Sequence, residues 1–374
     1  MTVTKKEILD ILQSIQIPSE KKTLMHFDIL KELSIDELEV KIKLLIKNPT
    51  LQFRKKIEFQ VNHLVQKISP KSTVKLEFVI DEKQKKEVNA NQKSKKNISS
   101  IKNIIAVASG KGGVGKSTVS SNLATSLSIL GKKVGLIDAD IYGPSIPIMF
   151  DVEKEKPIVS NIDGESLIKP IVSYGVKLLS IGFFSKPSDA IVWRGPMASK
   201  ALNQMIHQAN WGELDYLIID LPPGTGDIHL TLVQSIPLTG AIIVTTPQPI
   251  SLIDARKAAA MFKMKNINVP IIGMVENMSW FTPKDNPNKK YYIFGKEGGG
   301  NLSKDLGVPL LSSFPLLETV RESSDVGRPA ALQNNENSDM FKKFAEQVIK
   351  KTNERNISLS TTKRVKITHT KGCS

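Results

Sequence analysis

The chain has 374 residues, 40% of them hydrophobic and 24% charged, as in folded globular proteins and unlike disordered or collagen-like chains. No run in the chain approaches the ~18 apolar residues that a membrane-spanning helix needs. The N-terminus does not show the apolar stretch of a signal peptide. We therefore expect a cytoplasmic protein with no membrane partner. The net charge of +15 is spread along the chain without a basic stripe interleaved with aromatic residues, so we also expect no nucleic-acid partner.

Residues 1–80 predict a small α/β domain. Apolar residues at helical spacing from Ile8 to Leu12 indicate a helix, and the alternating stretch 39–46 indicates a strand. A second helical pattern runs from Phe53 to Ile68, and a second alternating stretch covers 73–80. Residues that follow, 81–100, are almost free of apolar side chains and rich in Lys, Asn and Gln, which predicts a flexible Lys-rich linker.

From residue 101 onward, short apolar strands alternate with helical patterns. Continuous β-branched runs of this kind favour a parallel sheet that is covered on both faces. We therefore predict a doubly wound, mostly parallel α/β domain over 101–350, followed by a polar, mobile tail over 351–374. The strand candidates are NIIAVAS (103–109), VGLID (134–138), YLIID (216–220), AIIVTT (241–246) and IIGMV (271–275).

A phosphate-binding loop, GKGGVGKS, begins directly after the first of these strands and ends where a helical pattern (118–130) begins. The string satisfies G-x-x-x-x-G-K-[ST] in the strand–loop–helix context that the motif requires. Its glycines allow backbone N–H groups to face phosphate oxygens, its second lysine can bind the β- and γ-phosphates, and its serine hydroxyl can bind Mg²⁺. The expected nucleotide contacts are Gly110, Lys111, Gly112, Gly113, Val114, Gly115, Lys116, Ser117 and Thr118.

Acidic residues end two of the predicted strands. Asp220 ends YLIID, where a carboxylate can bind Mg²⁺, and a backbone N–H at Gly224 in the following PPGTGD loop can bond the γ-phosphate. Asp138 and Asp140 lie at the end of VGLID, where carboxylates can orient or deprotonate the attacking water. Each aspartate could instead cap a turn, but three at strand ends of one sheet favour a shared site.

The extra lysine, Lys111, makes the loop resemble the deviant phosphate loop of the MinD/ArsA/nitrogenase-iron-protein superfamily. In that superfamily two subunits sandwich the nucleotides, and this lysine reaches the partner's phosphates. The resemblance therefore implies a homodimer in which Lys111 acts in trans, as an arginine finger does. The competing interpretation of Lys111 is an ordinary surface lysine.

Further motifs resemble the Mrp/ApbC-type family over essentially all of 101–340. They are DADIYGPSIP from Asp138, WRGPM from Trp193, LIIDLPPGTGD from Leu217, TTPQ from Thr245, ENMSWF from Glu276 and FGKEGG from Phe294. Asn277 occupies the position at which the superfamily contacts adenine, which implies ATP rather than GTP. A loop asparagine bonded to its own backbone is the alternative. Residues 1–80 resemble the small MIP18-like domain, related to cytosolic iron–sulfur assembly factors, that is often fused to such ATPases.

This family is associated with carrying iron–sulfur clusters, which its members bridge between two subunits through a C-x-x-C pair between the ENMS and FG motifs. The corresponding segment here, TPKDNPNKKYYI (282–293), contains no cysteine, so a four-thiolate bridge cannot form as in the family. The single cysteine is Cys373, near the C-terminus. One interpretation makes Cys373 of each subunit an incomplete ligand set that His369 or an outside thiol completes; the other makes it an incidental exposed cysteine.

The resemblance and the motifs together predict a slow, Mg²⁺-dependent ATPase that works as a homodimer and passes iron–sulfur clusters to apo iron–sulfur proteins or assembly factors. Lys111, Lys116, Asp138 and Asp140 are its expected catalytic residues. Two alternatives stay open: a nucleotide-switched scaffold that binds no cluster, and a MinD-like positioning ATPase. The terminal stretch KRVKITHTKGCS is too β-branched for the amphipathic membrane helix of the second alternative.

Overall fold

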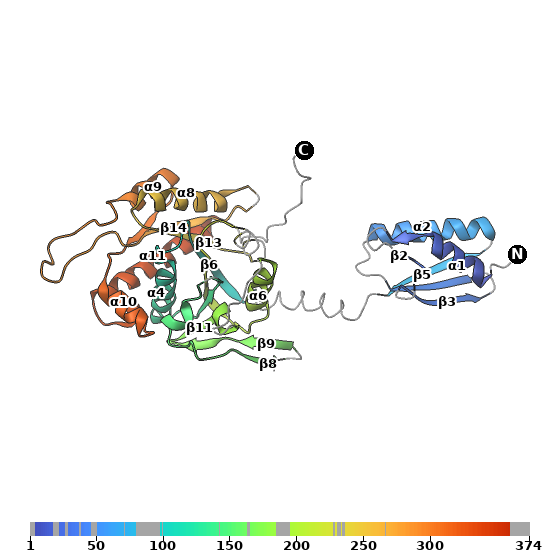
Figure 1. Cartoon of the computed structure of the whole chain (residues 1–374), viewed down its shortest axis with the longest axis horizontal. Coiled ribbons are helices and arrows are strands. Elements are labelled where there is room, and N and C mark those ends of the chain that lie inside the picture. The colour runs from blue at the N-terminus through green and yellow to red at the C-terminus, as the bar shows by residue number, and fades with distance from the viewer. Residues whose placement is uncertain are drawn as a thin grey trace. The chain divides into compact units, whose positions relative to one another are not determined.

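The chain divides into two units, Met1–Lys93 and Ser94–Ser374, each described by itself (Figure 1). The computed structural model describes residues 4–17, 22–26, 29–36, 39–45, 51–70, 72–79, 98, 100–141, 143–162, 165–184, 195–226, 229, 233, 236–265 and 267–359. Within these ranges no helix has both the length and the apolar character needed to cross a membrane.

The first unit packs two helices against a three-stranded sheet with the order β3-β4-β5. Strand β4 pairs antiparallel with β3 and parallel with β5. The predicted helices and strands are confirmed, and their apolar residues, such as Leu12, Ile42 and Val61, form the core of the unit. The elements are α1 (Lys5–Ser14), β1 (Gln16–Ile17), β2 (Lys22–Thr23), β3 (Leu30–Asp36), β4 (Glu39–Leu45), α2 (Leu51–Ile68) and β5 (Thr73–Val79).

The second unit is built on an eight-stranded sheet with the order β10-β11-β7-β12-β6-β13-β14-β15. All neighbouring strands are parallel except β10, which is antiparallel to β11. The five predicted strands are confirmed as β6, β7, β12, β13 and β14. The bounds are β6 (Ile101–Ser109), β7 (Val134–Asp138), β10 (Ile171–Ser173), β11 (Val176–Ser180), β12 (Leu214–Asp220), β13 (Gly240–Thr245), β14 (Ile271–Glu276) and β15 (Leu310–Ser313).

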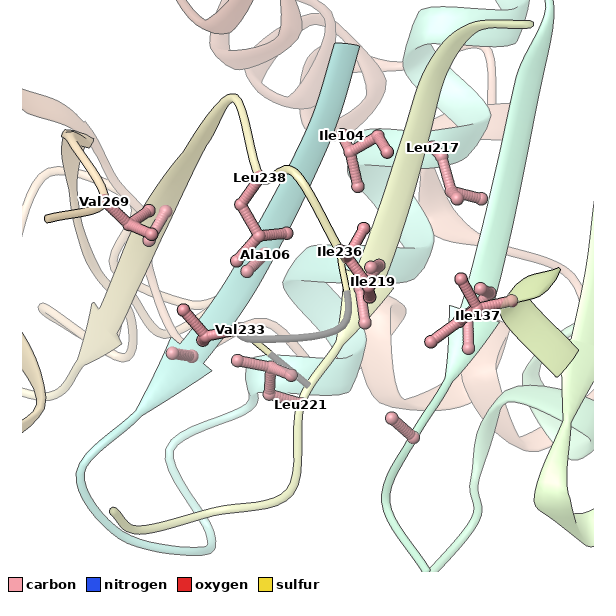
Figure 2. Close-up of a cluster of buried hydrophobic side chains, with 14 of the residues drawn as sticks. Ile104, Ala106, Ile137, Leu217, Ile219, Leu221, Val233, Ile236, Leu238 and Val269 are labelled. Carbon is pink, nitrogen blue, oxygen red and sulfur yellow. The ribbon is translucent and has the colours of Figure 1, made fainter. Parts of the chain in front are cut away.

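Helices cover both faces of this sheet. On one face, Ile104 and Ala106 of β6 lie in a buried cluster with Leu217 and Ile219 of β12 (Figure 2), to which α6 and α8 contribute side chains. On the other face, Ile105 joins a second cluster with residues of α4 and α11. The helices are α4 (Lys116–Ile129), α5 (Ile146–Met149), α6 (Gly195–His207), α8 (Pro249–Lys263), α9 (Gly298–Leu306), α10 (Glu318–Asp325) and α11 (Glu336–Ser358); a hairpin, β8 (Ile158–Ile162) and β9 (Glu165–Lys169), was not predicted.

The sheet topology brings the predicted site residues to one edge. Strand β6 lies at the centre, between β12 and β13, and the phosphate loop follows its carboxyl end. Because parallel strands end at the same edge, Asp138 of β7, Asp220 of β12 and Asn277 after β14 approach this loop. The order in which successive strands join the sheet reverses at β6, since β12 and β7 lie on one side of it and β13 and β14 on the other, and such switch points are where doubly wound sheets bind ligands.

Two predicted domain boundaries need correction. Helix α11 continues to Ser358, so residues 351–358 are not a mobile tail: Thr352 is fully buried, and the Asn356 amide donates to Asn103. The polar pattern hid this helix because its other terminal residues mostly face solvent. At the opposite end, Ile98 is buried and the Ser100 hydroxyl donates to the Gly212 carbonyl, so the end of the predicted linker belongs to the second unit.

We expect removal of residues 1–93 to leave nucleotide affinity within about twofold of the full chain, since the two units have separate cores. Removing residues 1–100 instead should lower the thermal unfolding midpoint, because it deletes buried Ile98 and the Ser100–Gly212 hydrogen bond. Titration with a fluorescent ATP analogue and thermal unfolding of both truncations would check this. Loss of nucleotide binding in the 94–374 chain would show that the first unit contributes to the site.

Candidate nucleotide-binding site

The phosphate loop has the backbone that its glycines predict. Gly113 and Gly115 have φ values of 79° and 80°, a left-handed conformation that side chains with a Cβ rarely adopt. Gly110 has no room for a side chain, since a Cβ there would overlap the backbone of Asp254 in α8. Helix α4 then begins at Lys116, and its free N–H groups point toward the cavity that phosphates would fill.

Lys116, Ser117 and Asp220 form one connected group at the start of α4. The Lys116 ammonium lies 2.7 Å from the Asp220 carboxylate, and the two side chains are only 6% and 0% exposed. The Ser117 hydroxyl donates to the same carboxylate at 2.6 Å, and the Ser120 hydroxyl donates to its second oxygen, also at 2.6 Å. Each oxygen of this buried carboxylate therefore has a partner, as a buried charge requires.

A hydroxyl and a carboxylate on one side of the loop are suitable ligands for Mg²⁺, which prefers oxygen ligands. Asp220 and Ser117 already approach each other within hydrogen-bonding distance, so both oxygens can reach one ion when Lys116 turns toward phosphate. The residues present thus fit the magnesium ion that a P-loop nucleotide brings. Its chemistry there would be neutralisation of phosphate charge.

Asp138 is bonded to the loop that follows β7. Its fully buried carboxylate accepts hydrogen bonds from the N–H groups of Asp140 and Ile146 and from the Ser180 hydroxyl. These contacts hold the loop between β7 and α5, and a role of Asp138 toward the attacking water stays a prediction. Asp140 lies at the phosphate cavity, 15% exposed and with its carboxylate 4.0 Å from the Lys116 ammonium.

The pKa of Asp138 is raised to about 7, first by burial and then by the charge of Asp220, and the charge of Lys116 and the hydrogen bonds from Ser180 and Asp140 oppose this only in part. In the unfolded chain the carboxyl ionises near pH 4. The folded protein therefore holds a proton on Asp138 that the unfolded chain releases, and the stability that this proton gives falls as the pH rises from about 4 to about 7.

We expect Asp138→Asn to remove this pH dependence in nucleotide-free protein with EDTA. The free energy of unfolding of the wild type relative to the variant should fall by about 2 kcal/mol between about pH 5 and pH 7. Urea denaturation of both proteins at the two pH values gives this difference directly. A difference that stays constant or grows with pH would contradict the raised pKa.

The loop after β12 is bonded to the end of β6. The Gly224 N–H, predicted to bond the γ-phosphate, donates to the Ser109 carbonyl at 3.0 Å. Nearby His229 is 2% exposed, and its Nε2 lies 2.7 Å from the Pro222 carbonyl oxygen, while burial lowers its pKa. A γ-phosphate contact would thus require Gly224 to exchange one hydrogen-bond acceptor for another.

Two cavities meet at the start of α4. The first, of about 230 Å³, is lined by the phosphate loop together with Asp140, Ser145 and Pro223. The second, of about 250 Å³ and termed here the base pocket, is mostly apolar and includes Asn277, Phe314, Leu316 and Met340. Gly115 and Thr118 line both. The pair has the form that a nucleotide needs: a polar cradle for phosphates beside an apolar slot for a base.

Asn277 lies at the junction of the two cavities. Its side-chain amide donates to the Val114 carbonyl at 2.9 Å, and its backbone N–H donates to Thr245. The alternative that Asn277 only bonds its own local backbone is therefore wrong, since Val114 belongs to the phosphate loop. Asn277 also lines the base pocket, where its contact to adenine stays a prediction.

Lys111 also lines the phosphate cavity. Its carbonyl accepts a hydrogen bond from the Ser109 hydroxyl, which anchors the backbone and leaves the side chain partly exposed. Among the residues that the structure describes, the Lys111 ammonium has no ion-pair partner. A cation without a partner at the mouth of a phosphate site is what the predicted role in trans requires.

The prediction that Cys373 and His369 are cluster ligands is not tested, because both residues lie outside the described part of the chain. Trp193 of the WRGPM motif also lies outside it. Within the described part of the chain, no group of three His, Cys, Asp or Glu side chains is arranged to hold a metal ion. Segment 282–293 carries exposed Lys and Tyr side chains.

Sequence reasoning missed three parts of the site. Ser120 holds Asp220, Ser180 holds Asp138, and residues 314–317 form a wall of the base pocket. Both serines resemble ordinary polar residues in the sequence. A strand end near residue 313 was the one available signal for the pocket wall, since the carboxyl edge of the sheet is where sites form.

Comparisons with known proteins agree with this geometry. Residues 100–351 match the ParA family profile described as NUBPL iron-transfer P-loop NTPase. An iron-sulfur cluster carrier protein of Synechocystis sp. is 40% identical over 336 residues, which cover 90% of this chain and 94% of that protein. The iron-sulfur cluster transfer protein NUBPL of Dictyostelium discoideum is 44% identical over 262 residues, covering 69% of this chain and 79% of that protein.

Among solved structures, a nucleotide-binding protein of Archaeoglobus fulgidus in complex with ADP is 35% identical to this chain. The two share a TM-score of 0.58, and the match covers 67% of this chain and 96% of the other. The predicted doubly wound, mostly parallel fold is therefore confirmed.

Proposed function

The chain belongs to the ParA family of P-loop NTPases, in the group described as NUBPL iron-transfer proteins, and on this premise we propose that it carries iron–sulfur clusters to apo iron–sulfur proteins under the control of Mg²⁺-dependent ATP hydrolysis. The observation that carries the nucleotide part is the phosphate loop, with Lys116, Ser117 and Asp220 joined at the start of α4. The relatives' names, iron-sulfur cluster carrier and transfer protein, support the cluster part.

In this proposal the chain's own residues position and neutralise the phosphates. Backbone N–H groups of the loop and the N-terminus of α4 bind phosphate oxygens, and Lys116 leaves Asp220 for the β- and γ-phosphates. Ser117 and Asp220 hold the magnesium ion. Asp140, which lines the phosphate cavity beside Lys116, orients the attacking water. Slow turnover follows if this arrangement is completed only when a partner binds.

The same proposal makes the working form a homodimer. Lys111 lines the phosphate cavity and has no ion-pair partner among the described residues, so it is available to a phosphate of the facing subunit. A cation that arrives only on dimer closure would stabilise the charge that develops in the transition state. Hydrolysis would then depend on dimer closure.

The proposed cargo is an iron–sulfur cluster, and its ligand set in this chain would differ from that of the family that the chain resembles. The cysteine pair of the resembling family is absent from 282–293, and Cys373 is the single thiol of the chain. We propose that Cys373 of each subunit supplies a thiolate and that an outside thiol or an imidazole completes the set, since iron–sulfur clusters accept both ligand types.

Anaerobic reconstitution with iron and sulfide tests this proposal, with iron and sulfide counted per dimer in the wild type and in Cys373→Ser. A cluster in the wild type that is lost in the variant supports the carrier function. If neither protein holds a cluster while both bind ATP, the chain is instead a nucleotide-switched scaffold for a partner that owns the ligands. Sedimentation with liposomes in the presence of ATP would identify a positioning ATPase.

A further inference from the structure

A second surface of interest is formed by residues 279–293, called here the lysine–aromatic hairpin. Its two arms are joined by reciprocal backbone hydrogen bonds of 2.8 Å between Phe281 and Tyr291. Turns at Asn286 and Lys289 close its tip. Figure 1 shows the hairpin within the orange loop that extends away from the sheet beside α9 and α10.

The aromatic rings of this hairpin are covered by lysine side chains. The Lys290 ammonium lies 4.2 Å from the centre of the Trp280 ring, and that of Lys289 lies 4.8 Å from the centre of the Tyr291 ring. Both lysines are exposed, and neither has an ion-pair partner among the residues that the structure describes. Cation–π contacts thus keep the positive charges of Lys289 and Lys290 beside these two rings at the surface.

The hairpin is bonded directly to the wall of the base pocket. The Leu316 N–H donates to the Trp280 carbonyl at 2.7 Å, and the Ser279 N–H donates to the Phe314 carbonyl at 2.8 Å. Phe314 and Leu316 line the base pocket. A displacement of this wall when a base enters the pocket would therefore reach Trp280 through one hydrogen bond.

A second connection runs through the residue that joins the two cavities. Asn277 bonds Val114 of the phosphate loop and lies two residues before the hairpin. At the other side, Lys284 of the hairpin forms an ion pair of 2.6 Å with Glu318, the first residue of α10, and Arg321 and Ser324 of α10 line the base pocket. The pocket and the hairpin thus share the elements that a nucleotide would contact.

We propose that the lysine–aromatic hairpin is a docking surface for a carboxylate-rich segment of a partner protein, and that nucleotide in the base pocket controls its affinity. The nucleotide dependence rests on the proposed function. Charge complementarity selects the partner: residues 282–293 contain three lysines and one aspartate, and Lys289 and Lys290 form no ion pair with any carboxylate in the described part of the chain.

The structure argues against one other occupant. Single-stranded nucleic acid binds through open aromatic faces on which bases stack, and here a lysine ammonium lies over one face of each of the Trp280, Tyr291 and Tyr292 rings. Carboxylates can pair with these lysines without displacing them from the rings.

The test measures binding of a fluorescein-labelled decaglutamate peptide to the full chain, with and without saturating Mg–ADP. The docking variant is Lys289→Glu with Lys290→Glu. The matched control is Lys342→Glu with Lys343→Glu, which changes the net charge equally at two exposed lysines of α11. We expect the docking variant to bind the peptide about tenfold more weakly than the control, and Mg–ADP to change the wild-type affinity about fivefold.

Separate outcomes decide the separate claims. Equal peptide binding by the two double variants overturns the docking surface. Binding of a dT20 oligonucleotide to the wild type that is lost in the docking variant also overturns it, because the lysines would then serve nucleic acid. A fluorescent ADP analogue first establishes nucleotide binding; if it fails to bind, the proposed function is what fails. If it binds while peptide affinity and the hydrogen exchange of the Leu316 and Tyr291 amides stay unchanged, the nucleotide control is overturned.

Discussion

Replacing Lys116 with alanine is expected to weaken ATP binding by at least about 100-fold, because the Lys116 ammonium is buried within the site, directly beside the residues proposed to hold Mg²⁺. Isothermal titration with Mg–ATP measures the loss. Unchanged affinity would refute the assignment of the phosphate loop.

A second effect of this substitution must be separated from the first. Lys116→Ala leaves the fully buried Asp220 carboxylate without its ion-pair partner, and breaking a buried pair in this way costs about 3–5 kcal/mol of stability. The double variant Lys116→Ala with Asp220→Asn removes both charges. We expect it to regain most of the lost thermal stability while still failing to bind ATP, which would show that weak binding is not a result of unfolding.

Replacing Lys111 with alanine is expected to abolish turnover while leaving ATP affinity within a few-fold of the wild type. Charge supplied in trans contributes about 10³- to 10⁵-fold to the rate in related phosphoryl-transfer sites, so we expect a loss of at least about 100-fold. Phosphate release under saturating ATP measures it. Wild-type turnover in this variant would show that Lys111 is an ordinary surface lysine.

Mixing two inactive variants distinguishes action in trans from action in cis. In a mixed dimer, the Lys111→Ala subunit keeps its own Lys116, and the Lys116→Ala subunit can supply Lys111 to the facing site. Mixtures should therefore regain turnover that neither variant shows alone. If Lys111 served its own subunit, no mixing ratio would restore activity.

Much of the sheet could be predicted because its central strands are short, apolar and β-branched, and because each ends at a residue of different chemistry. Strand β6 ends at Ser109, directly before the first glycine of the phosphate loop, and β7 and β12 end at Asp138 and Asp220. Buried strands exclude polar residues along their length, so a polar residue marks the edge of the sheet. The edge strands β10 and β15 are too short to give such a signal.

The parts that could not be predicted depend on contacts between distant residues. The carboxylate of Asp138 is visible in the sequence, but the use of its oxygens by Ile146 and Ser180 is not. The base pocket joins Asn277 to residues 314–341, which share no local pattern. Helix α11 continues to Ser358, and Thr352 in its last turns is buried within the second unit. A single buried threonine does not produce the repeating apolar pattern from which a helix is predicted.

The ion pair between Lys116 and Asp220 gives the site a cation of its own before any ligand arrives. If Lys116 turns to phosphate, the buried Asp220 carboxylate requires a substitute, since an unpaired charge with 0% exposure is costly. Metal-bound ATP brings that substitute with it, whereas metal-free ATP does not. In the proposed function, the site would therefore exchange one cation for another, and we expect it to bind ATP that carries Mg²⁺ in preference to metal-free ATP.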